Sequence, residues 1–342
     1  MPSSPVLPAS ADCPPERLLL QRLIAGPVSG DALARESGQT RAAVWKRISM
    51  LREAGVPIVA RPGVGYALAQ PVSLLDVDAI GSKLPTAARA LLASLEVRWS
   101  VDSTNAQLLA RPMPGALAEV LLAERQTGGR GRRGRQWQSP LAAHLYLSLQ
   151  RGFDGGLARL GGLSLVAGVA AVEAVHALGI GTARLKWPND LVVAGPEGLR
   201  KLGGILVEGG GEHAGPVRAV LGIGINVRMP AAQAALIDQP WTDLARCGDG
   251  DPPTRDALAA AVLDAWLPAL DLFDREGLAP FRERFARVDA LSGMAVDIHI
   301  GNAAVRGIAA GIADDGALQV EVDGALRVFH AGEVSVRRAG AA

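Results

Sequence analysis

The hydrophobic pattern changes character twice along this 342-residue chain, and these two changes limit the folds that it can adopt. Residues 15–70 show helical periodicity followed by a hairpin signal. From about residue 91 to residue 288, short apolar strands alternate with longer helical runs, which is typical of a sheet covered by helices. From Met294 to Arg338, short strands alternate with turn residues, as in a small β-barrel. The pattern predicts three structural units.

Composition agrees with packed structure and excludes global disorder. The chain is 49% hydrophobic and 20% charged, which gives enough apolar area to offset the ordering of the backbone. With 35 Lys and Arg against 34 Asp and Glu, the net charge of +1 argues against a whole surface that grips nucleic acid or anionic membrane. Two cysteines, Cys13 and Cys247, are too few for a disulfide framework or a Cys-based zinc site. A reducing compartment fits.

The sequence carries no signal for export or membrane insertion. The Pro-rich start, Met1–Pro15, lacks the basic and apolar regions of a signal peptide and is expected to form a short loose tail. The longest apolar stretch, Leu160–Val172, is shorter than the roughly 20 residues that a membrane helix needs. We expect a soluble, cytoplasmic protein without a membrane partner.

The first unit is interpreted as a winged helix-turn-helix. Three short helices and a hairpin are expected at Glu16–Ile24, Asp31–Glu36, from Thr40 to Gly55, and at Val56–Leu68. Ser29 and Thr40 are good N-caps for the second and third helices. The stripe of Val44, Ile48 and Leu51 is expected to face the other helices.

A basic patch lies on the third helix and the hairpin, where five basic residues oppose one acid, Glu53, for a local charge of +4. Such a helix suits the major groove of DNA, and a basic hairpin suits the backbone or the minor groove. The basic residues are Arg41, Lys46, Arg47, Arg52 and Arg61, and the candidate DNA-binding residues are Thr40, Arg41, Trp45, Lys46, Arg47 and Arg61. The alternative is a helical module that binds protein and whose basic residues are simply solvated.

The second unit is expected to hold a mixed sheet. Predicted strands are Glu96–Val101, Ala118–Glu124, Leu141–Leu149, Ala183–Lys186, Leu191–Val193, Gly203–Glu208 and Val217–Ile225. Predicted helices are a short one within residues 71–84, Leu160–Leu178, Arg255–Glu276 and Pro280–Val288. The segment Ala194–Gly198 is expected to lengthen a surface hairpin.

The most informative stretch is residues 126–137, here called the Arg/Gly loop. Gly129, Gly131 and Gly134 satisfy the G-x-G-x-x-G pattern of dinucleotide-binding folds, but that pattern requires a helix to begin inside it. Here a strand follows, so the motif lies in a loop between strands. Four arginines interleaved with glycines make a flexible loop that can fold over phosphate or carboxylate groups; they are Arg130, Arg132, Arg133 and Arg135.

Four further segments place polar groups at strand ends, and together they predict one cleft with cations and amides. The segments are Asp102–Asn105, Lys186–Asp190, Lys201–Glu208 and Gly222–Asn226. Ser103 and Thr104 have hydroxyls for a ligand or, alternatively, for capping a helix. The Walker A pattern is absent, so any bound ATP would not be held as in P-loop enzymes.

This set of motifs, in this order, closely resembles biotin protein ligases. With the N-terminal helix-turn-helix, the chain resembles the bifunctional form, in which ligase and biotin operon repressor share one chain. The resemblance covers nearly all of residues 15–338. It implies an α+β multidomain fold: a winged helix-turn-helix at 15–70, a mixed-sheet ligase domain like those of class II synthetases at 85–288, and an SH3-like β-barrel at 291–338.

The resemblance also implies site residues, which we state as expectations. Biotin-binding residues would be Ser103, Thr104, Asn105, Gln126, Arg130, Gly131, Arg132, Lys201, Gly203, Gly204 and Ile205. ATP-binding residues would be Arg130, Arg132, Arg135, Lys186, Asn189, Asn226 and Trp241, although Trp241 could equally be a core residue. Catalytic residues would be Arg132, Lys186, Lys201 and Asp190, with Asp190 also the nearest candidate for a Mg²⁺ contact.

The implied reaction joins biotin and Mg·ATP to form biotinyl-5′-AMP and then transfers biotin to a lysine of the biotin carboxyl carrier protein of acetyl-CoA carboxylase. Biotinyl-5′-AMP would also act as corepressor, by promoting a homodimer that binds operator DNA. Two alternatives remain open at this stage: a lipoate-type ligase that uses the same acyl-adenylate chemistry, and a repressor that senses a ligand without catalysis.

Overall fold

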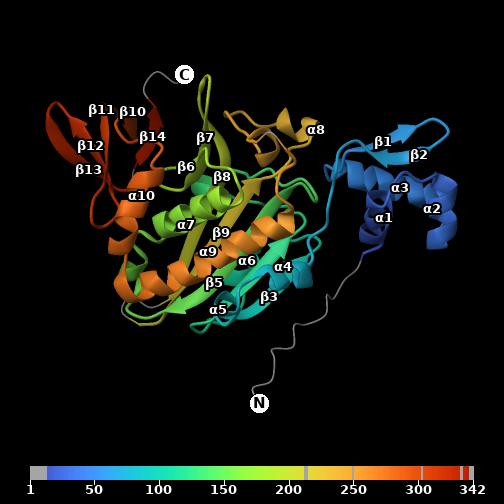
Figure 1. Cartoon of the computed structure of the whole chain (residues 1–342), viewed down its shortest axis with the longest axis horizontal. Helices are drawn as coiled ribbons and strands as arrows, with labels where there is room; N and C mark the ends of the chain where they lie inside the picture. Colours follow the sequence, from blue (N-terminus) through green and yellow to red (C-terminus); the bar gives the residue numbers. More distant parts are fainter. Residues whose placement is uncertain (1–13, 212–214, 249, 302, 332–333, 339–342) are drawn as a thin grey trace, which may run out of the picture.

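A computed structural model of the chain describes residues 14–211, 215–248, 250–301, 303–331 and 334–338. These residues form an α+β structure with three β-sheets, of two, seven and five strands. Figure 1 shows the N-terminal helices and hairpin at one end, the seven-stranded sheet with its helices in the middle, and the five-stranded sheet at the other end. The predicted loose tail and Cys13 lie outside the described residues.

The N-terminal unit is a winged helix-turn-helix, as predicted. Its elements are α1 (Pro15–Ile24), α2 (Gly30–Ser37), α3 (Arg41–Glu53), β1 (Ile58–Arg61) and β2 (Gly65–Leu68). The hydroxyl of Ser29 accepts from the Ala32 amide at 3.1 Å, and that of Thr40 accepts from the Ala43 amide at 3.2 Å, so both expected N-caps are confirmed. The stripe of Val44, Ile48 and Leu51 is buried in the unit's core, also as predicted.

The middle unit is built on a mixed sheet with strand order β3-β4-β5-β9-β8-β7-β6. Only β3 and β4 are parallel among these neighbours. Its strands are β3 (Leu92–Arg98), β4 (Ala118–Ala123), β5 (His144–Phe153), β6 (Ala183–Lys186), β7 (Asp190–Gly195), β8 (Gly198–Gly211) and β9 (Val217–Asn226). Its helices are α4 (Val77–Lys83), α5 (Thr86–Arg89), α6 (Thr104–Leu109), α7 (Leu163–Ala177), α8 (Ala231–Ala234), α9 (Arg255–Glu276) and α10 (Arg282–Val288).

The two faces of this sheet are covered differently, because side chains alternate along each strand. On β4, Val120 and Leu122 belong to the large core that α7 and α9 cover, whereas Leu121 packs with Leu108 of α6. Among the described residues, one segment, Leu157–Ala177, is long and apolar enough to cross a membrane by length and composition. Most of it is α7, whose side chains are buried in this core, so it is a core helix.

Several predicted boundaries need correction. The strand expected at Glu96–Val101 runs from Leu92 to Arg98, because the chain enters the sheet directly after α5. The strand expected at Leu141–Leu149 begins at His144, since Leu141 and Ala142 instead belong to the core of the N-terminal unit. The predicted helices at Leu160–Leu178 and Pro280–Val288 are shorter: α7 starts after two glycines, and a 3₁₀ turn precedes α10. Ala194–Gly198 closes the β7–β8 hairpin, with Gly195 opposite Gly198.

The N-terminal unit is seated on the segment that follows the Arg/Gly loop. The Leu141 amide donates to the Ala54 carbonyl at 2.8 Å. Gly55 is buried with φ of 100°, and a Cβ there would lie 2.6 Å from Pro140 and 3.2 Å from Gln233 of α8. Only glycine fits this position. The turn after α3 therefore touches two segments that border the seven-stranded sheet.

A buried ion pair fixes the connection between the two units. Arg255 Nη2 lies 2.7 Å from Glu124 Oε2, and both side chains are almost fully buried. The same arginine donates to the Ser73 carbonyl, and Glu124 Oε1 accepts from the Leu75 amide at 2.6 Å. A buried pair of this kind is strongly destabilised when one partner is removed. The connection is thus held by side chains of β4 and α9.

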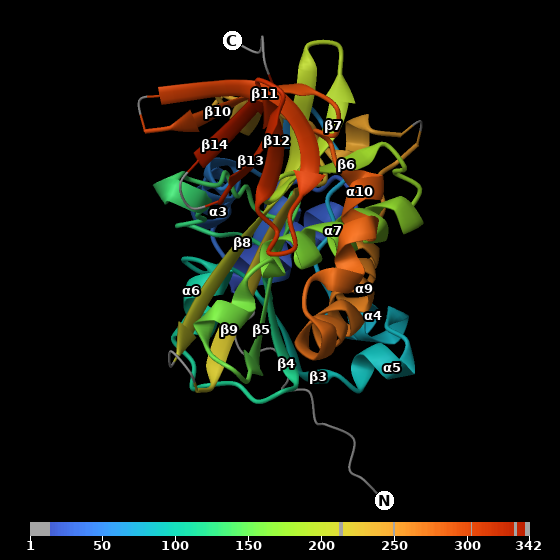
Figure 2. The same cartoon turned by 90° about the vertical axis from the view of Figure 1, so that its left-hand side faces the viewer.

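The C-terminal unit is the small antiparallel β domain that the sequence predicts. It consists of β10 (Ala295–Ile300), β11 (Ala303–Ile312), β12 (Leu318–Val322), β13 (Ala325–Phe329) and β14 (Val334–Arg338), in the order β13-β12-β11-β10-β14. Figure 2 views the molecule from this side. The indole N–H of Trp187, in the turn after β6, donates to the Gly316 carbonyl at 3.0 Å. The C-terminal unit is therefore attached beside the predicted cleft.

Candidate functional site

A cleft of about 880 Å³ lies on the face of the seven-stranded sheet that α6 covers. Three strands form its floor: Ser148 of β5 lies opposite Gly222 of β9, which lies opposite Leu206 of β8. In the next row, Gly224 lies between Tyr146 and Gly204. The glycines leave room for groups that lie directly on the backbone.

Two glycines of this floor are required by their neighbours. A Cβ at Gly222 would lie 2.2 Å from Asn105 Oδ1, and a Cβ at Gly224 would lie 2.7 Å from the indole of Trp137. Both distances are too short for any side chain. The alternation Gly-Ile-Gly-Ile in β9 therefore buries the isoleucines in the core and leaves the other face open for Asn105 and Trp137.

A chain of hydrogen bonds joins the polar groups at one end of the cleft. Gln126 Oε1 accepts from the Thr104 amide at 2.8 Å, and the Thr104 and Ser148 hydroxyls are 2.7 Å apart. The Ser148 hydroxyl donates to Asn105 Oδ1 at 2.6 Å. Ser103 caps α6 by accepting from the Ala106 amide at 3.4 Å, so the capping alternative applies to Ser103. These groups form one buried polar cluster.

The Arg/Gly loop connects β4 to β5, as predicted, and folds back on itself. The Trp137 amide donates to the Gly129 carbonyl at 2.9 Å, and the Gly131 amide donates to the Arg135 carbonyl at 2.7 Å. At the tip, Arg133 adopts φ of 58°, a left-handed conformation. The loop therefore forms a narrow hairpin-like projection over the cleft.

Arg132 reaches from this loop to two other parts of the protein. Its guanidinium donates to Asn189 Oδ1 at 3.2 Å and to the Ala331 carbonyl of the C-terminal unit at 2.5 Å. Burial lowers the pKa of Arg132, and the neighbouring charge of Arg133 lowers that pKa further. An anionic ligand would offset this cost, because an opposite charge stabilises the charged guanidinium.

The two predicted lysines both border the cleft. Lys201 Nζ lies 2.7 Å from Asp190 Oδ1 and 5.5 Å from the centre of the Trp137 ring. Lys186 ends β6, and the turn that follows is held by Asn189, whose side-chain amide donates to the Ile205 carbonyl at 2.7 Å. The arrangement places cations next to a backbone floor that anions can approach.

A segment after β9 covers the side of the cleft nearest Lys201. The Lys201 amide donates to the Pro240 carbonyl, and the Thr242 amide donates to the Lys201 carbonyl, both at 2.9 Å. Asn226 Nδ2 donates to the Thr242 carbonyl at 3.0 Å. Between these contacts, the Trp241 ring packs 4.3 Å from the guanidinium carbon of Arg246. Asn226 therefore holds the covering segment, and Trp241 belongs to it.

Most of the predicted ligand residues converge on this one cleft. Its walls include Ser103, Thr104, Asn105, Gln126, Arg130, Gly131, Arg132, Arg135, Lys186, Asn189, Asp190, Lys201, Gly204 and Ile205. Gly203, Asn226 and Trp241 are not among the lining residues; a Cβ at Gly203 would meet the Gly224 carbonyl at 2.7 Å. Their predicted ligand roles stay predictions.

No individual ligand role was predicted for four residues that shape the site, although three of them lie in segments expected to form the cleft: Trp137, Gly222, Gly224 and, outside those segments, Ser148. Strand alternation was a usable signal, because Tyr146 and Ser148 alternate with buried leucines on β5. The indole N–H of Trp137 is buried without a hydrogen-bond partner among the described residues. A ligand in the cleft could supply one.

The described residues contain no cluster of three or more His, Cys, Asp or Glu side chains able to hold a metal ion. Two carboxylates border the cleft, Asp190 and Asp238, and Asp190 already pairs with Lys201. A protein-held Mg²⁺ site is therefore not built here, although Mg²⁺ commonly arrives with substrate phosphates and water.

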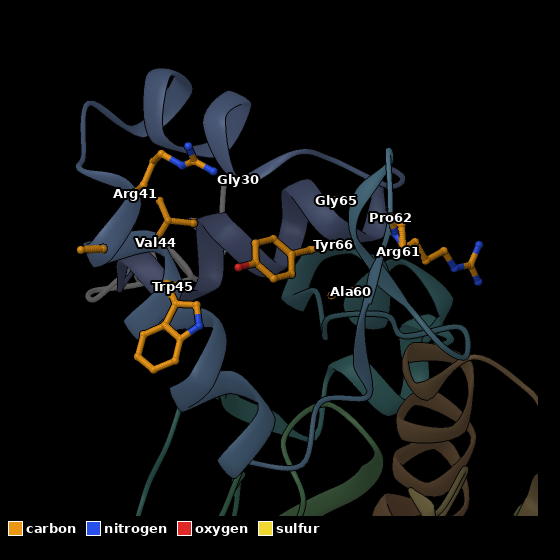
Figure 3. A pocket seen from close by; sticks show the side chains of 10 residues that line it. Gly30, Arg41, Val44, Trp45, Ala60, Arg61, Pro62, Gly65 and Tyr66 are labelled. Carbon is orange, nitrogen blue, oxygen red and sulfur yellow. The ribbon is translucent and has the colours of Figure 1, made fainter.

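A second concavity, of about 600 Å³, lies between α3 and the β1–β2 hairpin. Figure 3 shows the ring of Tyr66 at its centre, Arg41 and Trp45 on α3, and Arg61 extending outward from the hairpin. Arg41 pairs with Asp31 at 2.9 Å while remaining 77% exposed, and Trp45 is 61% exposed. Exposed cations on both sides of a concave surface suit a polyanion such as DNA.

The structure corrects the expected exposure of one residue, Arg47, whose DNA contact stays a prediction. Arg47 was expected to be exposed, but it is half-buried, forms an ion pair with Glu16 of α1 and donates to Gln39 at 2.9 Å. Its guanidinium is therefore used inside the unit, where it ties α3 to α1. The exposed cations that remain on this surface include Lys46 and Arg61.

Comparisons with known families match all three units. A family described as "Biotin/lipoate A/B protein ligase family" matches residues 102–226. An "HTH domain" matches residues 16–67, and a "Biotin protein ligase C terminal domain" matches residues 291–337. The three matches follow the order of the sheets in the structure.

Relatives match over most of their length. The chain is 40% identical to "Bifunctional ligase/repressor BirA" of Salmonella typhimurium, over 91% of this chain and 93% of that protein. It is 36% identical to "Biotin--[acetyl-CoA-carboxylase] ligase" of Mycobacterium tuberculosis, over 70% of this chain and 88% of that protein. A solved structure of the Aquifex aeolicus biotin protein ligase with biotin and ATP is 26% identical, with a TM-score of 0.59 over 72% of this chain and all of that one.

Proposed function

Because the chain belongs to the biotin protein ligase family, in the bifunctional form that carries a helix-turn-helix repressor domain, we propose that it adenylates biotin and transfers it to a carrier protein. The proposed acceptor is a lysine of the biotin carboxyl carrier protein of acetyl-CoA carboxylase. We place this activity in the cytoplasm, where ATP, acceptor and operator DNA occur together.

The proposed chemistry has two steps. A biotin carboxylate oxygen attacks the α-phosphorus of Mg·ATP, and the bond to the leaving pyrophosphate breaks, which gives biotinyl-5′-AMP. The acceptor ε-amine then attacks the acyl carbon; the acyl–phosphate bond breaks, AMP leaves and the nitrogen loses a proton. Neither step forms a bond to the enzyme. Catalysis therefore depends on positioning and on cations near developing charge.

The buried polar cluster would bind the ureido head of biotin. A ureido group presents a carbonyl acceptor and two N–H donors, and the cluster offers the amide of Gln126, the hydroxyls of Thr104 and Ser148, and the amide of Asn105. Gly204, Gly222 and Gly224 form the adjacent backbone floor, against which an apolar valeryl chain would lie.

The cations would act at the carboxylate and the α-phosphate. Lys201 and Lys186 border the cleft beyond the polar cluster, and Arg132 reaches over it from the Arg/Gly loop. Two anions react here, so fixed positive charge lowers the barrier more than a nucleophilic side chain would. The segment held by Asn226 and containing Trp241 would cover the nucleotide. Mg²⁺ would enter bound to ATP, while Asp190 pairs with Lys201.

The N-terminal unit would make the same chain a biotin-responsive repressor. Bound biotinyl-5′-AMP would order the Arg/Gly loop and favour a homodimer of the ligase unit, which would present two helix-turn-helix units to two operator half-sites. The exposed cations of α3 and the hairpin support this part of the proposal. An operator titration that gives equal affinity with and without biotinyl-5′-AMP would contradict it.

The observation that carries the ligase proposal is the convergence of both lysines, the Arg/Gly loop and the buried polar cluster on one cleft. The test is incubation of the protein with labelled biotin, Mg·ATP and a carrier domain. We expect label in the carrier and biotin-dependent exchange of pyrophosphate into ATP. Lipoate in place of biotin as the preferred substrate would indicate the lipoate-type alternative. Biotin binding without exchange would indicate a ligand sensor without catalysis.

A further inference from the structure

Glu208 of β8 lies beside the cleft but is not among its lining residues, and its carboxylate contacts two cleft residues at once. Oε2 accepts from Asn105 Nδ2 at 2.8 Å, and Oε1 lies 3.4 Å from Arg130 Nη2. We propose that Glu208 is a positioning residue that orients the amide of Asn105 and anchors the Arg/Gly loop through Arg130. This inference rests on the ligase function proposed above.

The first role follows from the hydrogen-bonding limits of each group. A carboxylate only accepts, so it selects the Nδ2 side of the Asn105 amide. The Oδ1 side then faces Ser148, whose hydroxyl must donate to it at 2.6 Å. Nδ2 also donates to the Leu206 carbonyl at 3.2 Å. Without the acceptor at Glu208, only the longer bond to the Leu206 carbonyl would hold this orientation, so the amide would turn over more readily and exchange a donor for an acceptor in the biotin-head site.

The direction of Asn105 also determines the hydroxyls beyond it. Because the Ser148 proton is committed to Asn105 Oδ1, the Thr104 hydroxyl keeps its own proton for Ser148 Oγ, 2.7 Å away, or for Gln126 Oε1, 3.1 Å away. The Thr104 amide also donates to Gln126 Oε1, at 2.8 Å. The carboxylate of Glu208, together with the Leu206 carbonyl, therefore selects the orientation of the Asn105 amide and, through it, the direction in which the Ser148 hydroxyl donates.

The second role concerns the base of the Arg/Gly loop. Arg130 and Gln136 pair across the loop, and Trp137 follows directly with its indole over Gly224. The ion pair with Glu208 therefore holds the strand of the loop opposite Trp137. Arg130 is 49% exposed, so the pair is partly screened and its contribution is modest. A modest contact suits a loop that must open for ligand exchange.

Two substitutions separate the roles. Glu208→Gln keeps an oxygen that can accept from Asn105 but removes the charge that faces Arg130. We expect biotinyl-5′-AMP release to become about threefold faster, with the biotin KM changed less than about twofold. Glu208→Ala removes both contacts, and we expect the biotin KM to rise about tenfold while the ATP KM stays within about twofold. Glu197→Gln, in the exposed β7–β8 turn, is the matched control.

A double-mutant cycle with Arg130→Met tests the pair directly. If Glu208 acts through Arg130, Glu208→Gln has no further effect on release in the Arg130→Met background. Additive effects would overturn the anchoring role. Equal rises in the KM of biotin and ATP in Glu208→Ala, with a lower melting temperature, would show a merely structural residue and overturn the orienting role. A wild-type protein that makes no biotinyl-5′-AMP would instead refute the proposed function.

Discussion

The two basic regions of this chain, α3 with its hairpin and the Arg/Gly loop, hold their cations in opposite ways. On the N-terminal unit, the supporting acids come from the same unit: Asp31 pairs with Arg41, and Glu16 pairs with Arg47. Arg41, Trp45 and Lys46 sit on α3, whose start is capped by the side chain of Thr40.

The Arg/Gly loop depends on distant parts of the protein. Arg130 pairs with Glu208 of β8, and Arg132 reaches Asn189 after β6 and the Ala331 carbonyl of the C-terminal unit. Its glycines leave the backbone free of side chains that would hinder folding over a ligand. The first region presents charge on a preformed surface, which suits a long polyanion. The second assembles charge around one small molecule.

Gly222→Ala tests this difference with the largest expected effect. The new Cβ would lie 2.2 Å from Asn105 Oδ1, so the polar cluster must shift. We expect kcat/KM for biotin in pyrophosphate exchange to fall by ~100-fold, since small displacements of positioning groups are this costly. Ligand-free DNA binding should be unchanged.

Gly210→Ala on β8 is the control, because a Cβ at Gly210 meets no atom within 4 Å. Equal activity of the two variants would show that the site tolerates displacement of Asn105. It would also mean that the cleft under the Arg/Gly loop does not depend on exact positioning, which is the property that distinguishes it from the preformed surface of α3 and the hairpin.

The second prediction uses pH to ask whether the two regions unfold together. His144 is buried beside β9, and burial lowers its pKa to about 3. An unfolded histidine titrates near about 6.5, so the unfolded chain binds the extra proton below that pH. Stability from this group is present above about pH 6.5 and is lost as pH falls toward 3, by about 1.4 kcal/mol per pH unit.

Asp289 has the opposite effect on stability over part of this range. Burial raises its pKa to about 6, so the folded state takes up this proton first and gains stability as the pH falls. The measurement is therefore the difference between wild type and His144→Gln in the pH slope of the unfolding free energy between pH 6 and 4. If the N-terminal unit melts separately, we expect this difference in slope in the unfolding transition of the ligase unit and not in that of the N-terminal unit. Equal slopes in the two proteins would mean that water reaches His144 in the folded state, so that its pKa stays near the value in the unfolded chain.

The sequence predicted much of the fold because its signals were local. Caps at Ser29 and Thr40, and the periodicity of α9, depend on neighbours within a few turns. Strand ends were less accurate where tertiary contacts decide them. Leu141 continues the apolar pattern of β5, yet it packs against α3, which no local pattern shows.

The same limit applies to the candidate site. Lysines and glycines in distinctive motifs were located in advance, because their chemistry is rare in ordinary strands. The role of Glu208 depends on the register of β8 against β9 and on Asn105, which lies 103 residues away in the chain. The exposure of Arg47 was predicted wrongly for the same reason, since its partner Glu16 lies on another helix.

The third prediction concerns the preformed surface. Lys46 and Arg61 are exposed on α3 and the hairpin, respectively. Replacing both by alanine should weaken operator binding about tenfold and reduce the slope of log K against log salt concentration by about 2, if each contacts one phosphate. Biotin transfer should be unchanged. An unchanged salt slope would assign this surface to a protein partner, the alternative that the sequence left open.

The smallest expected effect separates support from contact within the same surface. Arg47→Ala removes the ion pair with Glu16, in which the two side chains are only 26% and 16% exposed, so we expect the N-terminal unit to lose about 1 kcal/mol of stability. The salt slope of operator binding should stay at the wild-type value, because Arg47 would release no counterions. Thermal unfolding and salt titration of the same variant check both parts. A smaller salt slope of operator binding, with the stability of the N-terminal unit unchanged, would mean that Arg47 leaves Glu16 to bind phosphate. The N-terminal surface would then be assembled by its ligand, as we propose for the Arg/Gly loop.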